Sequence, residues 1–133
     1  MEPVPGAARS CLVVDDSAVV RKLARRLLEG HGFAVREAPD GAKALGAVRE
    51  AMPDLVLLDW NMPVMDGLEF LGHARREFGP DHPVVMLCTT EASFERILEA
   101  LTLGAQEYIM KPFDAAILRD KLALLGFVTD GSA

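Results

Sequence analysis

The sequence predicts an α/β protein in which five β-strands alternate with five α-helices. The first observation is the run 55–58, four aliphatic residues without polar alternation, which is typical of a strand buried on both faces. The second is that four other short apolar runs are each followed by a stretch with apolar residues at helical spacing. Such alternation favours right-handed crossovers and predicts one parallel sheet with helices on both faces.

Length and composition limit the possible classes of function. The chain has 133 residues, enough for one domain with a hydrophobic core. Half of the residues are hydrophobic and 26% are charged, as in an ordinary globular protein. The net charge of −6 argues against nucleic acid as the main partner, because binding phosphates requires a basic surface. No apolar run approaches about 20 residues, so we expect no membrane insertion.

The two ends of the chain are expected to lie outside the domain. Residues 1–10 are rich in Pro, Gly and Ala and predict a flexible lead-in, residues 11–127 form the domain, and residues 128–133 form a tail. The N-terminus lacks a basic region followed by an apolar core, so we expect no secretory signal and a cytoplasmic protein.

The N-terminal half predicts three strands and two helices. A strand over 11–14 ends at two aspartates, and a helix follows over about 17–29. A strand over 33–37 mixes polar and apolar residues, which indicates a sheet edge. A turn then opens a helix that runs to about residue 51, before the strand 55–58. The residues at inward helical positions are Val20, Leu23, Leu27 and Leu28, then Ala44, Leu45 and Val48.

The C-terminal half continues the alternation. A helix over about 68–78 leads to a strand over 84–88, and a further helix ends at Gly104. A strand over 106–110 and a helix that begins after Asp114 complete the pattern. The apolar residues at helical spacing are Phe94, Ile97, Leu98 and Leu101, then Ile117, Leu118, Leu122 and Leu125.

The first helix carries four basic residues on its polar side: Arg21, Lys22, Arg25 and Arg26. A solvated helix face is one interpretation of these charges. A docking surface for an acidic or phosphorylated partner is the other. The sequence leaves both open.

Polar side chains follow four of the five predicted strands. Asp15 and Asp16 follow the first, Asp59 the third, Thr89 the fourth and Lys111 the fifth. In an open parallel sheet, ligands bind outside the carboxyl ends of the strands. We therefore expect these five side chains to form one site.

The chemistry of the predicted site follows from its charges. Three neighbouring carboxylates repel one another, and a divalent hard cation such as Mg²⁺ would relieve the repulsion. Lys111 adds a second positive charge, so the site would attract a phosphoryl group, to which Thr89 would donate a hydrogen bond. Asp59, at the centre, is the expected acceptor and would form an acyl phosphate.

Five segments carry a family resemblance: residues 13–17, 58–63, 65–67, 89–92 and 108–113. With them the chain resembles the receiver domain of two-component response regulators over roughly residues 10–127. The segment 59–63, Asp-Trp-Asn-Met-Pro, is most similar to the chemotaxis-type single-domain regulators. The resemblance implies a flavodoxin-like (βα)5 fold with strand order 2-1-3-4-5.

The resemblance also implies roles for the site residues. Asp59 would take a phosphoryl group from a phosphohistidine on a sensor histidine kinase. Asp16 and Asp59 would bind Mg²⁺ directly, together with the backbone carbonyl of Asn61, while Asp15 would bind it through water. Lys111 would pair with the phosphoryl oxygens.

A switch is implied as well. Thr89 would swing toward the phosphoryl group and Tyr108 would rotate inward behind it. Thr90 stands where the family commonly has a smaller residue, and its bulk would crowd the path of attacking water. Asn61 and Glu91 match residues that tune dephosphorylation, and we expect self-hydrolysis within seconds to minutes. Lys111-Pro112 is often a cis peptide in this family.

Several other residues receive non-catalytic interpretations. We expect Trp60 to lie exposed beside the acceptor and to report Mg²⁺ or phosphate by fluorescence. Cys11 and Cys88 are expected to be core thiols, since the implied strand order places another strand between them. His31, His73 and His82 are assigned no phosphotransfer role.

The signal is expected to leave through protein contact, and we expect a monomer. The face made by the fourth helix, fifth strand and fifth helix would bind the downstream target, with these candidate residues: Phe94, Arg96, Glu99, Tyr108 and Lys121. A flagellar motor switch component, another kinase and a histidine phosphotransfer protein remain open as targets, so a phosphorelay intermediate is the alternative function.

An enzyme of the haloacid dehalogenase type is a further alternative, because it also uses Mg²⁺ and an acceptor Asp. Such phosphohydrolases place the nucleophile after the first strand, with a second Asp two residues later. Here Asp59 follows the third strand and Asn61 occupies the second position. We therefore expect a signalling phosphoacceptor that catalyses only its own phosphorylation and dephosphorylation. Nucleotide binding is disfavoured, since no glycine-rich phosphate loop follows the first strand.

Overall fold

The computed structural model describes residues 9–90 and 93–127, and these contain five strands and five helices. The strands are β1 (Arg9–Val14), β2 (Phe33–Ala38), β3 (Leu55–Asp59), β4 (Val84–Thr89) and β5 (Glu107–Met110). The helices are α1 (Ala18–Glu29), α2 (Gly41–Glu50), α3 (Gly67–Phe78), α4 (Phe94–Thr102) and α5 (Ala115–Leu124). The predicted alternation is confirmed.

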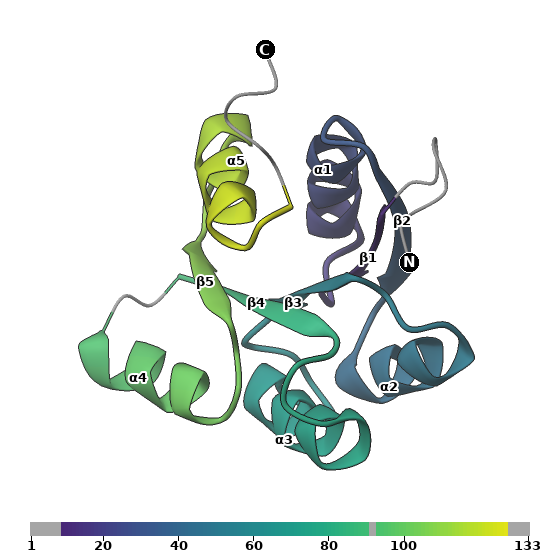
Figure 1. The fold of residues 1–133 in the computed structure, drawn as a ribbon, viewed down its shortest axis with the longest axis vertical. Coiled ribbons are helices and arrows are strands. Elements are labelled where there is room, and N and C mark those ends of the chain that lie inside the picture. Colours follow the sequence, from purple (N-terminus) through teal and green to yellow (C-terminus); the bar gives the residue numbers. More distant parts are fainter. Residues whose placement is uncertain (1–8, 91–92, 128–133) are drawn as a thin grey trace.

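The strands form one parallel sheet in the order β2-β1-β3-β4-β5, as the resemblance implied. Figure 1 shows α1 and α5 on one face of this sheet and α2, α3 and α4 on the other. The mixed polarity of residues 33–37 is explained by the position of β2 at the sheet edge, where fewer side chains are covered.

The central strand β3 explains the unbroken aliphatic run. All of its residues are buried, and they alternate between the two layers of the core. Val56 and Leu58 point to the layer under α2 and α3, whereas Leu55 and Leu57 point to the layer under α1 and α5. A strand with a hydrophobic layer on each face cannot carry alternating polar residues.

Each helix begins at a short polar side chain that accepts a hydrogen bond from the backbone amide three residues later. These caps are Ser17, Asp40, Asp66, Ser93 and Asp114. At α3 the cap is reciprocal, because Glu69 also reaches back to the amide of Asp66. The caps fix where the loops at the carboxyl edge end and the helices start.

The first strand begins earlier than predicted. Arg9 and Ser10, placed in the lead-in by sequence, pair with Phe33 and Ala34 of β2. The guanidinium of Arg9 also donates to the carbonyl of Gly126 at 3.2 Å and lies 5.1 Å from the ring centroid of Phe127. Contacts with residues near the C-terminus thus accompany the longer β1, and the composition of residues 1–10 could not predict them. Residues 1–8 of the predicted lead-in 1–10 and the whole predicted tail 128–133 lie outside the described residues.

Three helices bury less of their apolar surface than the spacing predicted. Leu23 of α1 is 58% exposed, and α1 is instead anchored by the buried Ala24 and Leu28. In α4, all of which is described, only Ala100 is buried, and Phe94 is 76% exposed. Leu98 and Leu101 of α4 and Ile117 of α5 are also exposed. The small Ala100 brings the helix close to the sheet while its larger neighbours face outward.

The loops at the amino edge of the sheet are held by one arginine. The guanidinium of Arg75, on α3, donates to the carbonyl of Gly104 at 3.0 Å and to the side-chain oxygen of Gln106 at 2.8 Å. It also donates to the carbonyls of Gly79 and His82. The end of α4 is thereby fixed to α3.

The cysteines are free and buried, as predicted. Cys11 lies on β1 and Cys88 on β4, with β3 between them. Burial raises the pKa of the Cys88 thiol to about 12, so this thiol stays protonated and is an inert core side chain. Within the described residues, no helix is long and apolar enough to cross a membrane.

Candidate functional site

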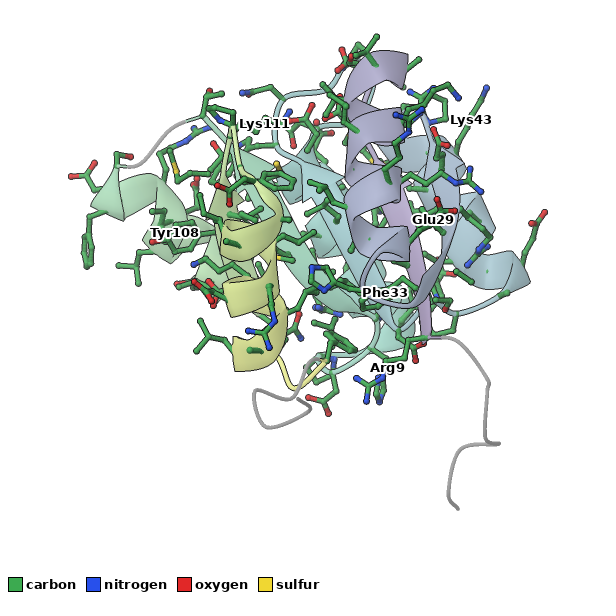
Figure 2. The ribbon with its side chains drawn as sticks, turned by 90° about the horizontal axis from the view of Figure 1, so that it is seen from above. Arg9, Glu29, Phe33, Lys43, Tyr108 and Lys111 are labelled. Carbon is green, nitrogen blue, oxygen red and sulfur yellow. The ribbon has the colours of Figure 1, made fainter. Side chains whose placement is uncertain are left out.

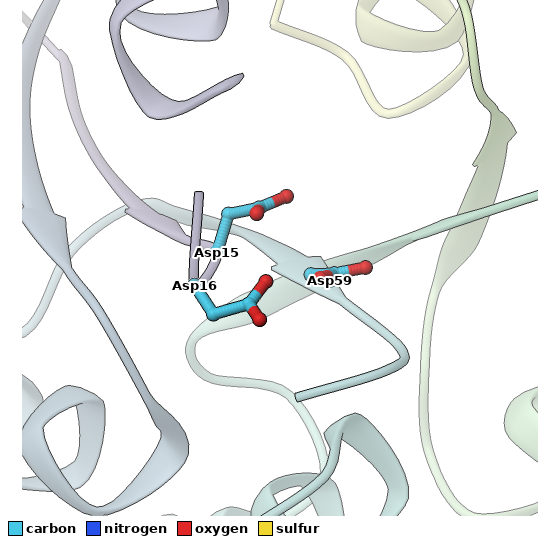
Figure 3. Close-up of side chains that lie close together, drawn as sticks. All are labelled: Asp15, Asp16 and Asp59. Carbon is cyan, nitrogen blue, oxygen red and sulfur yellow. The ribbon is translucent and has the colours of Figure 1, made fainter. Parts of the chain in front are cut away.

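The carboxyl edge of the sheet brings the five predicted site residues together. Asp15 and Asp16 follow β1, Asp59 ends β3, Thr89 ends β4, and Lys111 follows β5. Figure 3 shows the three carboxylates side by side, and one oxygen from each lies within 4.8 Å of the others. Figure 2 shows Lys111 at the end of the molecule opposite Arg9.

Lys111 joins two of the carboxylates. Its ammonium lies 3.0 Å from Oδ2 of Asp15 and 3.0 Å from Oδ1 of Asp59. The backbone amide of Lys111 donates to the carbonyl of Thr89, and the Lys111-Pro112 peptide is cis. The ammonium therefore reaches the acidic residues from a position fixed by β4 and β5.

The protonation of Asp59 is set by opposing effects. Its carboxylate is only 6% exposed, and this burial raises its pKa above the usual value, as does the nearby charge of Asp15. Hydrogen bonds from Lys111 and from the backbone amide of Asn61 act in the other direction but do not outweigh burial. The negative charge of the buried Asp59 carboxylate is thus only partly compensated.

Lys111 responds in the opposite sense. Burial alone would lower the pKa of its ammonium, but the hydrogen bonds to Asp15 and Asp59 outweigh this and raise it. One ammonium shared by two carboxylates is well stabilised, whereas each carboxylate has only part of one positive charge. The two pKa directions together describe a site with an excess of negative charge.

The donor set suits a divalent hard cation. Three carboxylates face one ammonium, and their oxygens are close enough to reach a common ion. Hard cations such as Mg²⁺ take oxygen ligands and retain several waters. The exposed position of Asp16 leaves one side of the cluster open to solvent. Asp15, Asp16 and Asp59 therefore fit Mg²⁺; the role of the Asn61 carbonyl remains a prediction.

The two adjacent threonines have different surroundings. Thr89 is buried at the end of β4, whereas Thr90 is exposed. Thr90 and Lys111 both line a largely apolar cavity of about 340 Å³ between α1 and the start of the β5–α5 connection. The remaining lining residues are Val20, Leu23, Ala24, Leu27, Pro112 and Phe113. Glu91, expected to tune dephosphorylation, lies outside the described residues.

Tyr108 lies on β5 and is half-buried against the core layer under α2, α3 and α4. The ammonium of Lys121, from α5, lies 4.2 Å from the centroid of its ring and 3.1 Å from the carboxylate of Glu107. Tyr108 and Lys121 are therefore in contact on the face of α4, β5 and α5 that is predicted to bind the downstream target.

The expectation that Trp60 is exposed is wrong, because its side chain is 3% exposed and belongs to the core. Backbone hydrogen bonds to Cys88 and Gly67 continue the line of β3 past Asp59 and turn the indole inward. The guanidinium of Arg96, on α4, lies 4.5 Å from the centroid of the indole ring system. Nothing in the sequence signals this contact between the residue after Asp59 and α4.

Gly67 fits tightly against the backbone of Asp59 and Trp60. A Cβ atom there would lie 2.8 Å from the carbonyl oxygen of Asp59 and 3.0 Å from the Cα of Trp60. We expect Gly67→Ala to lower the free energy of unfolding by about 1–3 kcal/mol, because backbone must shift to admit the methyl group. Gly46→Ala, in the middle of α2 with no atom within 4 Å of the added Cβ, should raise it by about 0.5–1 kcal/mol. Urea unfolding measures the free energy of both variants, and an equal change in Gly67→Ala and Gly46→Ala would contradict the prediction.

The basic side of α1 is not simply solvated. Arg21 and Arg25 both bind the carboxylate of Glu37 on β2, with N–O distances of 3.1 and 2.9 Å. Arg21 also donates to the backbone carbonyl of Asp15 at 2.7 Å. The spacing of charges along a helix could not reveal these contacts, since both partners lie outside α1.

Comparisons with known proteins agree on one family. A family model for the response regulator receiver domain matches residues 11–123. The chain is 39% identical over 123 residues to "Chemotaxis protein CheY-3" of Vibrio cholerae serotype O1, covering 92% of this chain and 95% of that protein. It is 37% identical over 112 residues to "Chemotaxis protein CheY" of Pseudomonas aeruginosa, covering 84% and 90%.

Solved structures give the same result. The structure of Vibrio cholerae chemotaxis protein CheY4 superposes with a TM-score of 0.82 at 33% identity, covering 92% of this chain and 100% of that one. The fold, the acidic edge and the sequence match lead to one conclusion: the chain belongs to the response regulator receiver domain family.

Proposed function

We propose that Asp59 accepts a phosphoryl group from a phosphohistidine on a sensor histidine kinase in a Mg²⁺-dependent reaction. The observation that carries the proposal is the buried Asp59 carboxylate, 3.0 Å from the Lys111 ammonium and within 4.8 Å of the oxygens of Asp15 and Asp16. Membership of a signalling family supports a phosphoacceptor rather than an enzyme with turnover.

In this mechanism an oxygen of Asp59 attacks phosphorus, the P–N bond to the donor imidazole breaks, and an acyl phosphate forms. Asp16, Asp59 and the Asn61 carbonyl would hold Mg²⁺, with Asp15 reached through water. The ion would neutralise the negative charge that builds up as the Asp59 carboxylate approaches the anionic phosphoryl group. Lys111 turns from the carboxylates to a phosphoryl oxygen, and the hydroxyl of Thr89 donates to another.

The kinase must bring its phosphohistidine to this edge of the sheet. The cavity between α1 and the β5–α5 connection adjoins Lys111, and its wall includes the exposed Leu23. An apolar surface continuous with the acceptor site is suited to the segment of the kinase that carries the phosphohistidine. We therefore place the donor on this side of the molecule.

The phosphorylated protein acts by binding a downstream protein through α4, β5 and α5. This face carries the exposed Phe94, the Tyr108–Lys121 contact, Glu99 beside a surface concavity, and Arg96, which stacks on Trp60 next to the acceptor. The similarity to chemotaxis proteins supports chemotaxis-type signalling. Rotation of Tyr108 and movement of Thr89 would couple the acceptor to this face.

The test is the intact mass of the protein after brief incubation with acetyl phosphate and Mg²⁺. We expect the wild type to gain one phosphoryl group, and Asp59→Asn to gain none. Addition of a chelator should abolish the gain in the wild type, because the carboxylates then repel the anionic donor. Equal modification of both proteins would show that Asp59 is not the acceptor. A gain that persists in chelator would exclude the metal requirement.

A further inference from the structure

We propose that Arg21 is a positioning residue for the cation site, because its guanidinium holds the peptide that leads from Asp15 to Asp16. The inference depends on the proposed function, in which these aspartates bind Mg²⁺. It concerns a residue on α1 that contacts neither the cation ligands' carboxylates nor the phosphoryl group.

The two aspartates are fixed to very different degrees. The backbone amide of Asp15 donates to Ala38 at 3.2 Å, and its carboxylate accepts hydrogen bonds from Ser17 at 2.9 Å and from Lys111 at 3.0 Å. Asp16 is exposed, and no described residue donates a hydrogen bond to its carboxylate. The direction of the Asp16 side chain therefore depends on the backbone that precedes it.

That backbone is held by Arg21. Its Nη1 donates to the carbonyl oxygen of Asp15 at 2.7 Å, and its Nε donates to Oε1 of Glu37 at 3.1 Å. The Arg21 and Glu37 side chains are 17% and 16% exposed, so both bonds are partly shielded from water. The guanidinium is planar and rigid, and Glu37 lies on β2. One side chain thus ties the peptide between the two aspartates to the sheet.

Arg21 has two possible effects on a bound cation, and they differ in sign. As a positive charge near the cluster, it repels Mg²⁺, so its removal would strengthen binding. As a brace for the peptide, it keeps Asp16 directed at the ion, so its removal would weaken binding. Groups that orient metal ligands from outside the first layer typically alter affinity by about 10–100-fold. The bracing effect is therefore expected to be the larger one.

The experiment measures the Mg²⁺ dissociation constant by isothermal titration calorimetry at neutral pH, without a phosphoryl donor. Arg21→Gln removes the charge and the fork, whereas Arg21→Lys keeps the charge and removes the fork. We expect both variants to bind Mg²⁺ about tenfold more weakly than the wild type. Circular dichroism at the titration temperature verifies that each variant is folded, which separates loss of ligand geometry from loss of fold.

Arg25→Gln is the matched control. Arg25 also lies on α1 and binds Glu37 and Glu29, but it does not bond to Asp15. We expect its Mg²⁺ affinity to stay within about twofold of the wild type, because the brace is intact and its charge is solvent-screened. Weakening by Arg25→Gln equal to that by Arg21→Gln would overturn the proposal.

The remaining outcomes are also decisive. Wild-type affinity or tighter binding in Arg21→Gln would refute the brace, and would leave the proposed function intact. Tenfold weaker binding in Arg21→Gln with full affinity in Arg21→Lys would show that a single ammonium holds the peptide as well as the fork does, and would refute the requirement for the guanidinium. If the wild type itself binds no Mg²⁺, the proposed function and this inference both fail.

Discussion

Replacing Lys111 with Met should lower the free energy of unfolding in metal-free buffer by about 2–4 kcal/mol, because two buried carboxylates lose their shared counter-charge. The ammonium lies 3.0 Å from Asp15 and from Asp59, and both aspartates are buried. Met matches the length of the Lys stem, so little packing is lost. The raised pKa of Lys111 indicates that its charged form is favoured in the folded state. Urea unfolding at pH 7 in the presence of a chelator measures the change.

Two companion measurements identify the cause of that loss. The double variant Lys111→Met/Asp59→Asn should recover most of the lost stability, since one of the repelling carboxylates has gone. Lowering the pH toward 4 should also reduce the difference in unfolding free energy between the wild type and Lys111→Met, because protonation of a carboxylate removes the repulsion between Asp15 and Asp59. If the double variant is destabilised relative to the wild type as much as Lys111→Met is, the cause is a packing defect instead.

Asp59→Asn should have the opposite effect and raise the free energy of unfolding in metal-free buffer at pH 7 by about 1–2 kcal/mol, since a neutral amide replaces an insufficiently compensated buried charge. Loss of the hydrogen bond to Lys111 limits the gain, but Lys111 keeps its bond to Asp15. Thermal or urea unfolding of the two proteins at equal ionic strength measures the difference. A less stable Asp59→Asn protein would show that the Lys111 bond outweighs burial.

The sign of the pH dependence follows from the pKa of Asp59, which is higher in the folded protein than the ordinary value of 3.8. The folded state therefore retains the proton to higher pH than the unfolded state. The contribution of this carboxyl group to stability is fully present below pH 3.8 and is lost as the pH rises through the folded pKa. The advantage of Asp59→Asn should accordingly appear as the pH rises through this window, and saturating Mg²⁺ should reverse it by stabilising the wild type.

The placement of the candidate site residues could be predicted from sequence because these residues are tied to regular features. The aliphatic run 55–58 defines a strand, and the residue after it must lie at the carboxyl edge of the sheet. The same rule places Asp15, Thr89 and Lys111 at that edge, and the structure brings the side chains of Asp15 and Lys111 into contact. Their order across the sheet came only through the family resemblance, since apolar patterns do not encode which strands are neighbours.

Features that depend on side-chain direction were not predictable. Trp60 follows Asp59 in the chain, and the inward direction of its ring goes with the backbone hydrogen bonds to Cys88 and Gly67, which the sequence does not reveal. The bond from Arg21 to the Asp15 carbonyl joins a helix side chain to a backbone atom, for which no residue pattern exists. Helical spacing predicted an apolar face on α4 but could not show that the sheet covers only Ala100.

The sparse burial of α4 has a consequence for the energy scale of signalling. The helix is attached near its beginning by Arg96 on Trp60 and after its end by Arg75 on Gly104, with one buried side chain between. Two placements of such a helix can differ by far less than the stability of the whole domain. A phosphoryl group that favours one placement by about 2.8 kcal/mol changes the ratio of their populations about a hundredfold. The domain can thus be redistributed between states by a modification too weak to unfold it.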